Sequence, residues 1–314
     1  MRVFSYTRFM TFSFVIVNYN TRELLKDCIE NLLKVRETYK GTEIIVVDNL
    51  SFDGTDQMIQ YEYKDKVIFI KNTANNLPMG HNLGFGASHG DFVVHLGSDA
   101  YPTADQLQIL VEFMNKTPDA GICTGKIVTK DGNLDMDAHR GLVTPWTALS
   151  HWSGLDKIFA KNPLFDRYFL GYKDMTVPHE IDVCISHFMM IRREAYEKVG
   201  KWDTTFFMYG EDLDFCYRMQ KAGYKIYYVP QAVITHLKGA TVGRKSTDNI
   251  DNASRRDYNH MKRVRKETVR AMRIFYTKHL APTYPFYVNW AVYSGMSLLK
   301  IFRSVKFFIL GSGY

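Results

Sequence analysis

The chain has 314 residues, 46% of them hydrophobic, and a formal net charge of +7. This length accommodates one large α/β domain with an appendage, or two modest domains, and the hydrophobic content is ordinary for a globular protein. The four cysteines have no close pairing and no metal-ligand spacing, which argues against a disulfide framework and a cysteine-based metal site. They are typical of reduced, buried thiols in the cytosol.

The first third of the chain alternates apolar runs with amphipathic stretches. The run Phe12-Ser-Phe-Val-Ile-Val17 fits a fully buried parallel strand, and the stretch after it has a helical stripe of apolar residues that Thr21 can cap. Strands alternating with helices at this spacing predict a right-handed, doubly wound α/β sheet. We expect strands at 12–17, 43–48, 67–70 and 91–96, helices at 21–36 and 51–61, and a loop at 80–90.

Polar residues follow three of these predicted strands. They are Asn18-Tyr19-Asn20, Asp48-Asn49 and Gly97-Ser98-Asp99. Ligands of doubly wound sheets bind at the carboxyl ends of the strands. These three segments are therefore expected to form the ligand site.

The second half is less regular. Residues 131–180 are rich in aromatics, Gly and Pro without periodicity, which predicts a loop-dominated insertion over the sheet. The apolar stretch 287–299 is shorter than the about 20 residues needed to span a bilayer, so with the basic residues after it we expect an interfacial helix. Other expected elements are strands at 181–191, 224–229 and 232–236, and helices at 194–199, 212–222 and 252–279.

Charge divides the chain unevenly. Residues 244–314 carry a net charge of +10, whereas residues 1–243 carry −3. We therefore expect a domain at 1–243 and a basic, helical C-terminal extension at 244–314. The extension predicts a polyanionic partner, and an anionic membrane surface is favoured because the acidic body argues against nucleic acid. Packing back on the domain and a homodimer contact stay open as alternatives.

An acidic cluster begins the helix expected at 212–222. Glu211, Asp212 and Asp214 fall within four positions, directly after an apolar run that includes Phe206. The positive end of a helix dipole favours carboxylates, but a single one would suffice as a cap. Three carboxylates beside an aromatic wall predict a catalytic base or a metal site. Asp214 and Arg218 are spaced i and i+4, which predicts a structural ion pair.

Five motifs in register resemble family 2 glycosyltransferases with the GT-A fold. Four of them are Val15–Asn20, Val46–Gly54, Gly80–Gly84 and Leu96–Asp99. The fifth, Trp202-Asp203 followed by Phe206 to Cys216, resembles the rhamnosyltransferase-like branch, as do His236 and Gly239. The resemblance covers roughly residues 11–280. It implies transfer of a sugar from a nucleotide-diphosphate donor to an acceptor.

The resemblance assigns donor binding to the polar strand ends. Asp48 would hydrogen-bond the nucleotide base and Tyr19 would offer it a flat surface, although a helix cap and a packing aromatic are the structural alternatives. Asp53 precedes Gly54 and could serve the turn alone. His81 is expected to face the diphosphate. The full expected set is Asn18, Tyr19, Asn20, Asp48, Asn49, Asp53, His81, Asn82, Ser98 and Asp99.

The family's metal motif is Asp-x-Asp, and here it is incomplete. Its counterpart is Gly97-Ser98-Asp99, so only the second acid is present. Mg²⁺ or Mn²⁺ is the implied cofactor, held by Asp99, with His236 as a second ligand or as a donor to the diphosphate. The missing first acid puts metal dependence in question, and a structural role for His236 is the alternative.

The resemblance also names the catalytic base. In an inverting transfer a base deprotonates the acceptor hydroxyl, and that base is Asp212, with Glu211 beside it. Neighbouring carboxylates and aromatic walls would raise its pKa towards a useful value. A capping cluster is the alternative reading of both residues.

The sequence thus predicts an inverting glycosyltransferase of cell-surface polysaccharide synthesis. We expect it in the cytoplasm, peripheral at the inner face of the cell membrane, with a glycan or lipid-linked acceptor. The favoured donor is dTDP-rhamnose, and UDP- or GDP-sugars stay open. A non-catalytic nucleotide- or glycan-binding relative is the alternative. A nicotinamide dehydrogenase is disfavoured, because Asn18-Tyr19-Asn20 replaces a Gly-x-Gly-x-x-Gly turn.

Overall fold

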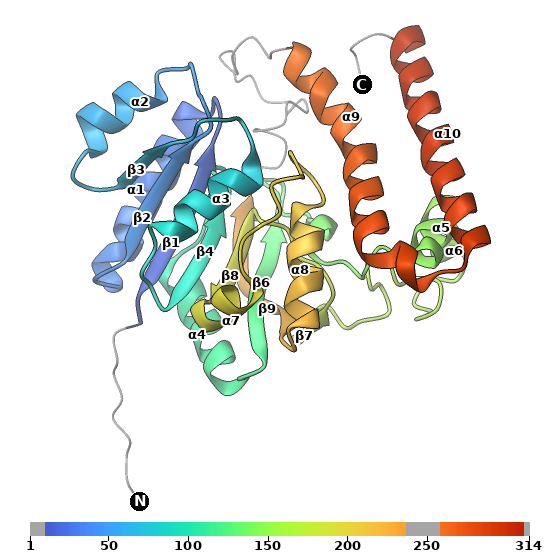
Figure 1. Ribbon diagram of the computed structural model, residues 1–314. Helices are drawn as coiled ribbons and strands as arrows, with labels where there is room; N and C mark the ends of the chain where they lie inside the picture. The colour runs from blue at the N-terminus through green and yellow to red at the C-terminus, as the bar shows by residue number, and fades with distance from the viewer. Residues whose placement is uncertain (1–9, 237–257, 311–314) are drawn as a thin grey trace, which may run out of the picture.

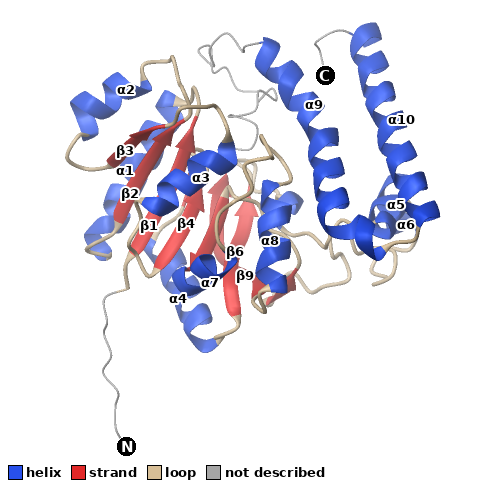
Figure 2. Cartoon of the chain, in the orientation of Figure 1, coloured by secondary structure: helices blue, strands red, loops and turns tan. Residues whose placement is uncertain are grey.

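A computed structural model of the protein describes residues 10–236 and 258–310. This part of the chain forms one mixed sheet of nine strands, in the order β3-β2-β1-β4-β8-β6-β9-β5, with β7 beside β9 (Figures 1 and 2). The strands are β1 (Phe12–Asn18), β2 (Glu43–Asp48), β3 (Ile68–Lys71), β4 (Phe92–Leu96), β5 (Ala100–Tyr101), β6 (Ala120–Val128), β7 (His179–Ile181), β8 (Phe188–Arg192) and β9 (Lys225–His236).

The first four strands are parallel, as their unbroken apolar runs predict. The register places Asn18 directly beside Asp48, so two of the predicted polar strand ends meet. The sheet then turns antiparallel at β8, which pairs with β4 and β6.

Helices cover both faces of the sheet (Figure 2). Helices α1 (Arg22–Thr38), α2 (Thr55–Met58) and α4 (Ala104–Lys116) bury their apolar residues in one core with β1 and β4. Helices α3 (Leu77–Gly86), α7 (Arg193–Val199) and α8 (Glu211–Lys221) form the core on the other face. This two-sided cover is the doubly wound arrangement that the alternating pattern predicts.

The loop expected at residues 80–90 was wrong, because helix α3 occupies most of this stretch. Asn76 caps the helix by accepting a hydrogen bond from Met79 N at 2.9 Å. A Cβ on Gly80 would lie 2.6 Å from Val17 Cγ1, and one on Gly84 would collide with Val15. The glycines therefore permit close packing of α3 on β1 and do not mark a turn.

Other element boundaries also differ from the sequence expectations. The helix expected at 51–61 is α2 continued by a π-helical turn, η1 (Ile59–Tyr63). The strand expected at 181–191 is two strands, β7 and β8, joined by a loop. The strands expected at 224–229 and 232–236 are one bulged strand, β9. The elements α4 and β6 were not predicted from the sequence.

The insertion at 131–180 is mostly loop, as expected, but it contains short helices. These are η2 (Met136–Ala138), α5 (Pro145–Ser153) and α6 (Leu155–Ile158). Helix α5 begins with a capping box in which Thr144 Oγ1 accepts from Thr147 N at 3.2 Å, and Pro145 follows at the first helical position. These helices pack through aromatic contacts and lack a periodic apolar stripe, so no sequence pattern predicted them.

The C-terminal helices form a hairpin beside α8. Helix α9 (Tyr258–Phe275) leads through η3 (Tyr276–Leu280) and η4 (Ala281–Thr283) into α10 (Phe286–Leu310) (Figure 1). Phe206, before α8, packs with Phe275 and Tyr276 in a third apolar cluster. Across the described helices, α10 included, none is both long and apolar enough to span a membrane. The boundary expected at 243/244, and Gly239, lie outside the described residues.

Candidate functional site

The carboxyl ends of β1 and β2 are joined by a buried polar network. Asn18 Nδ2 donates to Ser51 Oγ at 3.1 Å and to Thr55 Oγ1 at 3.2 Å. Thr21 Oγ1 donates to Asn18 Oδ1 at 2.5 Å, and Asp48 Oδ2 accepts from Ser51 N at 3.0 Å. Asn18 and Asp48 are both buried. They therefore hold the two strand-end loops in fixed positions.

The outer part of this network carries two aromatic rings. Asn20, at a left-handed φ of 54°, accepts a hydrogen bond from Phe52 N at 2.8 Å. The rings of Tyr19 and Phe52 meet edge to face with centroids 6.3 Å apart, and Phe52 is 68% exposed. Asp53 Oδ1 accepts from Thr55 N at 3.1 Å, which closes the turn, and Asp53 Oδ2 accepts from Arg22 N at 2.8 Å, which joins the two loops. Phe52 was missed from the sequence, where an aromatic within a polar loop was its only signal.

Asn49, Asn82 and Ser98 each have a protein partner. Asn49 Oδ1 accepts from Asn72 Nδ2 at 2.7 Å, and the Ser98 and Thr21 hydroxyls lie 2.9 Å apart. Asn82 exchanges two hydrogen bonds with the Trp202 backbone, at 2.8 and 2.9 Å. These side chains thus tie the loops of the strand ends to one another.

His81 lies inside the core, on helix α3. Its ring packs between His95 and Trp202, with centroids 4.2 and 4.6 Å away. Burial, together with the charge of His187, lowers the pKa of His81 to about 3. The ring is neutral and buried because helix α3 replaces the expected loop, and the expectation that His81 faces the diphosphate stays a prediction.

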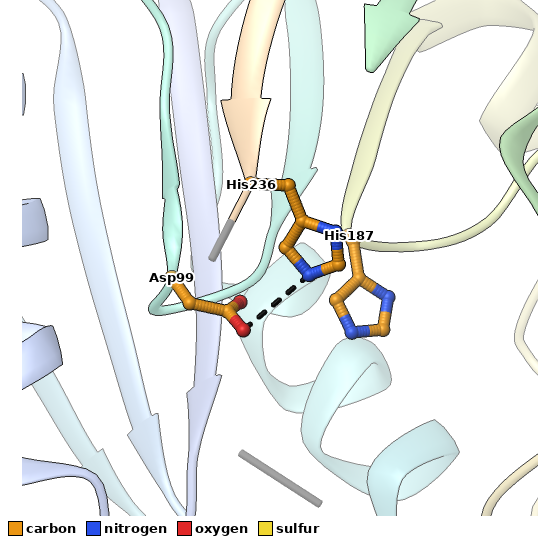
Figure 3. A group of neighbouring side chains, drawn as sticks. All are labelled: Asp99, His187 and His236. Carbon is orange, nitrogen blue, oxygen red and sulfur yellow. Dashed lines mark ion pairs between the residues drawn. The ribbon is translucent and has the colours of Figure 1, made fainter. Parts of the chain in front are cut away.

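Three side chains from different segments converge beyond the end of β4 (Figure 3). Asp99, His187 and His236 each offer a ligand atom, and these atoms all lie within 4.8 Å of one another. His236 Nε2 is 3.3 Å from Asp99 Oδ2. The structure thus brings together Asp99 and His236, as predicted, and adds His187. No spacing in the sequence singles out His187, which precedes β8 by one residue.

The geometry explains the glycine at position 97. A Cβ there would lie 2.7 Å from Asp99 Oδ1 and 3.2 Å from His187 Cδ2. Gly97 N also donates to the His187 carbonyl at 3.0 Å. The space where the family motif has its first acid is therefore taken by Asp99 and the histidine ring.

Asp135 orients His236 from the opposite side. Its Oδ2 lies 3.3 Å from His236 Nδ1, and both side chains are buried. Burial lowers the pKa of His236, but hydrogen bonds and charges from Asp135 and Asp99 outweigh burial and raise it to about 9. His236 is thus a cation that offsets two buried acids, and coordination of a metal by its Nε2 requires that the proton on this nitrogen is released. Asp135 belongs to the aperiodic insertion, so no sequence pattern identified it.

The residues of this cluster fit a divalent cation. Asp99 is fully buried, and His236, at 3.3 Å, is a charged partner of its carboxylate. Neither carboxylate oxygen accepts a hydrogen bond of good geometry from the described residues, so both have capacity for a further ligand. One carboxylate oxygen with two imidazole nitrogens suits a transition-type divalent ion better than Mg²⁺, which prefers oxygen ligands.

The acidic start of α8 forms a second centre. Arg140 Nη2 contacts Asp212 Oδ2 at 3.2 Å, and Glu211 and Asp212 are both buried. Burial and the adjacent Asp212 raise the pKa of Glu211 to about 8. Glu211 therefore keeps its proton near neutral pH, and Asp212 is held in an ion pair with the guanidinium of Arg140. Arg140, like Asp135, lies in the aperiodic insertion and was missed.

The ion pair predicted between Asp214 and Arg218 is confirmed, with Arg218 Nε 2.7 Å from Asp214 Oδ2. Asp214 also accepts from Lys278 Nζ and His279 Nε2, each at 2.7 Å. Hydrogen bonds from these three residues lower its pKa despite burial. Asp214 therefore ties α8 to the C-terminal hairpin and is set apart from Glu211 and Asp212.

Sequence comparison finds relatives among glycosyltransferases. The family model described as Glycosyl transferase family 2 matches residues 13–200. An N-acetylglucosaminyl-diphospho-decaprenol L-rhamnosyltransferase of Mycobacterium tuberculosis is 26% identical over 234 residues, which cover 68% of this chain and 72% of that protein. Rhamnosyltransferase WbbL of Escherichia coli K12 is 24% identical over 230 residues, covering 69% and 79%.

Solved structures share the fold at low identity. GalNAc-T7 with UDP, GalNAc and Mn²⁺ matches 73% of this chain with a TM-score of 0.52 and 18% identity. The mannosyltransferase PcManGT of Pyrobaculum calidifontis, with GDP-Man and Mn²⁺, matches 76% with a TM-score of 0.50 and 16% identity. The matches span 44% and 58% of those chains. They confirm the predicted GT-A fold.

Proposed function

This chain belongs to glycosyl transferase family 2, and we propose that it transfers a sugar from a nucleotide-diphosphate donor to a glycan or lipid-linked acceptor. The observation that carries the proposal is the buried carboxylate of Asp99 beyond the carboxyl end of β4, where it converges with His187 and His236. It lies at the end of the sheet where doubly wound folds bind ligands. The strand-end loops held by Asn18 and Asp48 belong to the same end.

The nucleotide of the donor binds over these loops. The exposed ring of Phe52, with Tyr19 at its edge, offers a flat apolar surface for the base. Asn18, Asn20, Asp48 and Asp53 fix the loops that present it. dTDP-rhamnose is the favoured donor because two relatives are named rhamnosyltransferases. UDP- and GDP-sugars are the other candidates, since solved neighbours contain UDP and GDP-Man.

Asp99, His187 and His236 would hold the divalent cation, with His187 in place of the acid missing at Gly97. Mn²⁺ is favoured over Mg²⁺ by the two imidazole ligands and by its presence in solved neighbours. When bound, the cation would neutralise the charge of the diphosphate leaving group. Asp135 would keep His236 in the orientation that points Nε2 towards Asp99.

Asp212 serves as the base of an inverting transfer. Arg140 holds its carboxylate in place, and this carboxylate accepts the proton of the acceptor hydroxyl as that oxygen attacks the sugar. The nucleotide diphosphate leaves from the opposite face of the ring. Glu211, protonated near neutral pH, is a hydrogen-bond donor in this arrangement and not a second base.

The acceptor is placed at a membrane surface by the C-terminal helices. One relative acts on a diphospho-decaprenol-linked sugar, which favours a lipid-linked acceptor in cell-surface polysaccharide synthesis. Helix α10 exposes several large apolar side chains: Phe286, Tyr287, Trp290, Leu298, Ile301 and Phe302. With Lys300 and Arg303 nearby, this surface suits peripheral contact with anionic lipids at the cytoplasmic face.

A panel of nucleotide sugars tests the proposal, with Mn²⁺ present or chelated. The cognate donor should raise the melting temperature by an amount that grows with the logarithm of its concentration above Kd, and it should be hydrolysed slowly without acceptor. The Asp212→Asn variant should keep the thermal shift and lose transfer. Absence of any shift and any hydrolysis would refute the enzyme assignment. A shift without turnover in the wild-type protein would support the non-catalytic relative instead.

A further inference from the structure

An apolar groove of about 440 Å³ lies between α5, α9 and α10. Its described lining contains no charged side chain and includes Leu149, Trp152, Met272, Phe275, Val292 and Met296. The small residues Ala148, Ala291 and Gly295 keep it open, and a Cβ on Gly295 would meet nothing within 4 Å. Its volume is in the range of ligand-binding clefts.

One end of the groove lies next to the start of α8. Leu213, which lines it, is the residue directly after Asp212. On the other side, Val143 lines the groove three residues after Arg140, the partner of Asp212. Leu142, between them, packs in the same apolar cluster as Leu213. The backbone segments that carry Asp212 and Arg140 therefore continue directly into the lining of the groove.

The rim of the groove is exposed and apolar. Leu149 is 56%, Trp152 58% and Tyr287 61% exposed. Helices α5 and α10, which carry these residues, lie side by side at the edge of the molecule (Figure 1). A contiguous apolar surface of this kind in contact with water indicates a ligand or a membrane. An extended peptide would bring backbone amides that this lining cannot satisfy, whereas a hydrocarbon chain brings none.

We propose that the groove binds the hydrocarbon chain of a lipid-linked acceptor, so that the sugar at its head lies at Asp212. The inference rests on the proposed function and specifies its acceptor class. A chain running from the rim of α10 to Leu213 would leave the bilayer at the exposed aromatic residues and end at the base. The groove would thus select acceptors by the presence of a long apolar chain.

Binding of isoprenyl monophosphates of increasing length, measured by tryptophan fluorescence without nucleotide sugar, tests the groove directly. Affinity should rise steeply with each isoprene unit, since burial of a single CH₂ group strengthens binding about fourfold. Gly295→Phe should fill the groove without a backbone clash and weaken farnesyl phosphate binding at least tenfold. Ser297→Phe adds the same ring to an exposed position of α10 outside the lining and should leave binding unchanged.

Three results would overturn the inference. One is an affinity that does not depend on chain length, and another is unchanged farnesyl phosphate binding by Gly295→Phe. The third is a wild-type dimer that Gly295→Phe converts to a monomer, because a second copy would then occupy the groove. Donor hydrolysis should be equal in both variants and the wild type. If the wild type hydrolyses no donor but its affinity for isoprenyl monophosphates still rises with chain length, the proposed function is refuted and the groove assignment is retained.

Discussion

Two buried carboxylates of this protein differ in their ion-pair partners and in the roles that these partners indicate. Asp99 and Asp214 are both fully buried. Asp214 lies between α8 and the C-terminal hairpin and is paired with Arg218, Lys278 and His279. Asp99 lies at the end of the sheet and is paired with one charged residue, His236, at 3.3 Å. Equal burial with unequal pairing favours a structural role for Asp214 and is compatible with the ligand-binding role that we propose for Asp99.

The largest expected effect is a loss of sugar transfer when Asp99 is replaced. Asp99→Asn should lower sugar transfer by about 10²–10³-fold, because it removes the anionic ligand of the cation that stabilises the leaving group. The melting temperature should fall less than that of Asp214→Asn, since Asp99 has one charged partner, His236, whereas Asp214 has three. Transfer assays measure the loss of activity, and thermal unfolding measures the melting temperature. If Asp99→Asn is as strongly destabilised as Asp214→Asn, the two acids do not differ in their contribution to stability.

Asp214→Asn should give the reverse result. Removing one partner of a buried ion-pair group leaves its cations without compensation, which costs about 3 kcal/mol of unfolding free energy. Denaturant unfolding measures this loss, and the thermal shift caused by a nucleotide sugar should be retained at a temperature where the variant is folded. Wild-type stability with impaired donor binding would place Asp214 in the site.

Asp135→Asn sharpens the comparison by acting on Asp99 through His236. Loss of an outer partner of a metal-bound histidine typically weakens metal affinity 10- to 100-fold. Calorimetric titration of Mn²⁺ without donor should show a loss in this range. Asp137→Asn, in the short helix η2 that Asp135 caps, is the matched control and should bind Mn²⁺ as the wild type does. Equal affinities for all three proteins would remove Asp135 from the site.

The smallest effect is a pH trend in stability from Glu211. Its pKa is raised to about 8 by burial and Asp212 and lowered in part by Arg140, so the folded protein holds a proton that the unfolded chain loses above about pH 4.5. The stability that depends on this proton is complete below pH 4.5 and is lost as the pH rises through 8. Glu211→Gln lacks this dependence.

Thermal unfolding of the wild type and Glu211→Gln over this pH range should therefore show a widening advantage for the variant of a few degrees. A constant difference between the two would mean that Glu211 is already ionised at low pH, and that it shares the role of base with Asp212.

Much of the region at the carboxyl ends of β1, β2 and β4 was predicted from the sequence, because the patterns that identify it are local. The apolar runs of β1, β2 and β4 and the polar residues after them placed Asn18, Asp48 and Asp99 at one edge of the sheet. The insertion at 131–180 was less predictable. Helix α5 and the loops around Arg140 pack through aromatic contacts, and their sequence shows no apolar periodicity. Helix α3 was misread because glycines that allow close packing resemble glycines of a turn.

The sequence by itself determined the family, the doubly wound sheet, the pairing of Asp214 with Arg218 and the presence of Asp99 and His236. Only the tertiary structure decided which residues surround them. His187 and Asp135 are 88 and 36 residues from Asp99 in the chain, and Arg140 is 72 residues from Asp212. Antiparallel pairing of β8 with β4 and the path of the insertion bring them together. Such contacts follow from the packing of distant segments, which no local pattern records.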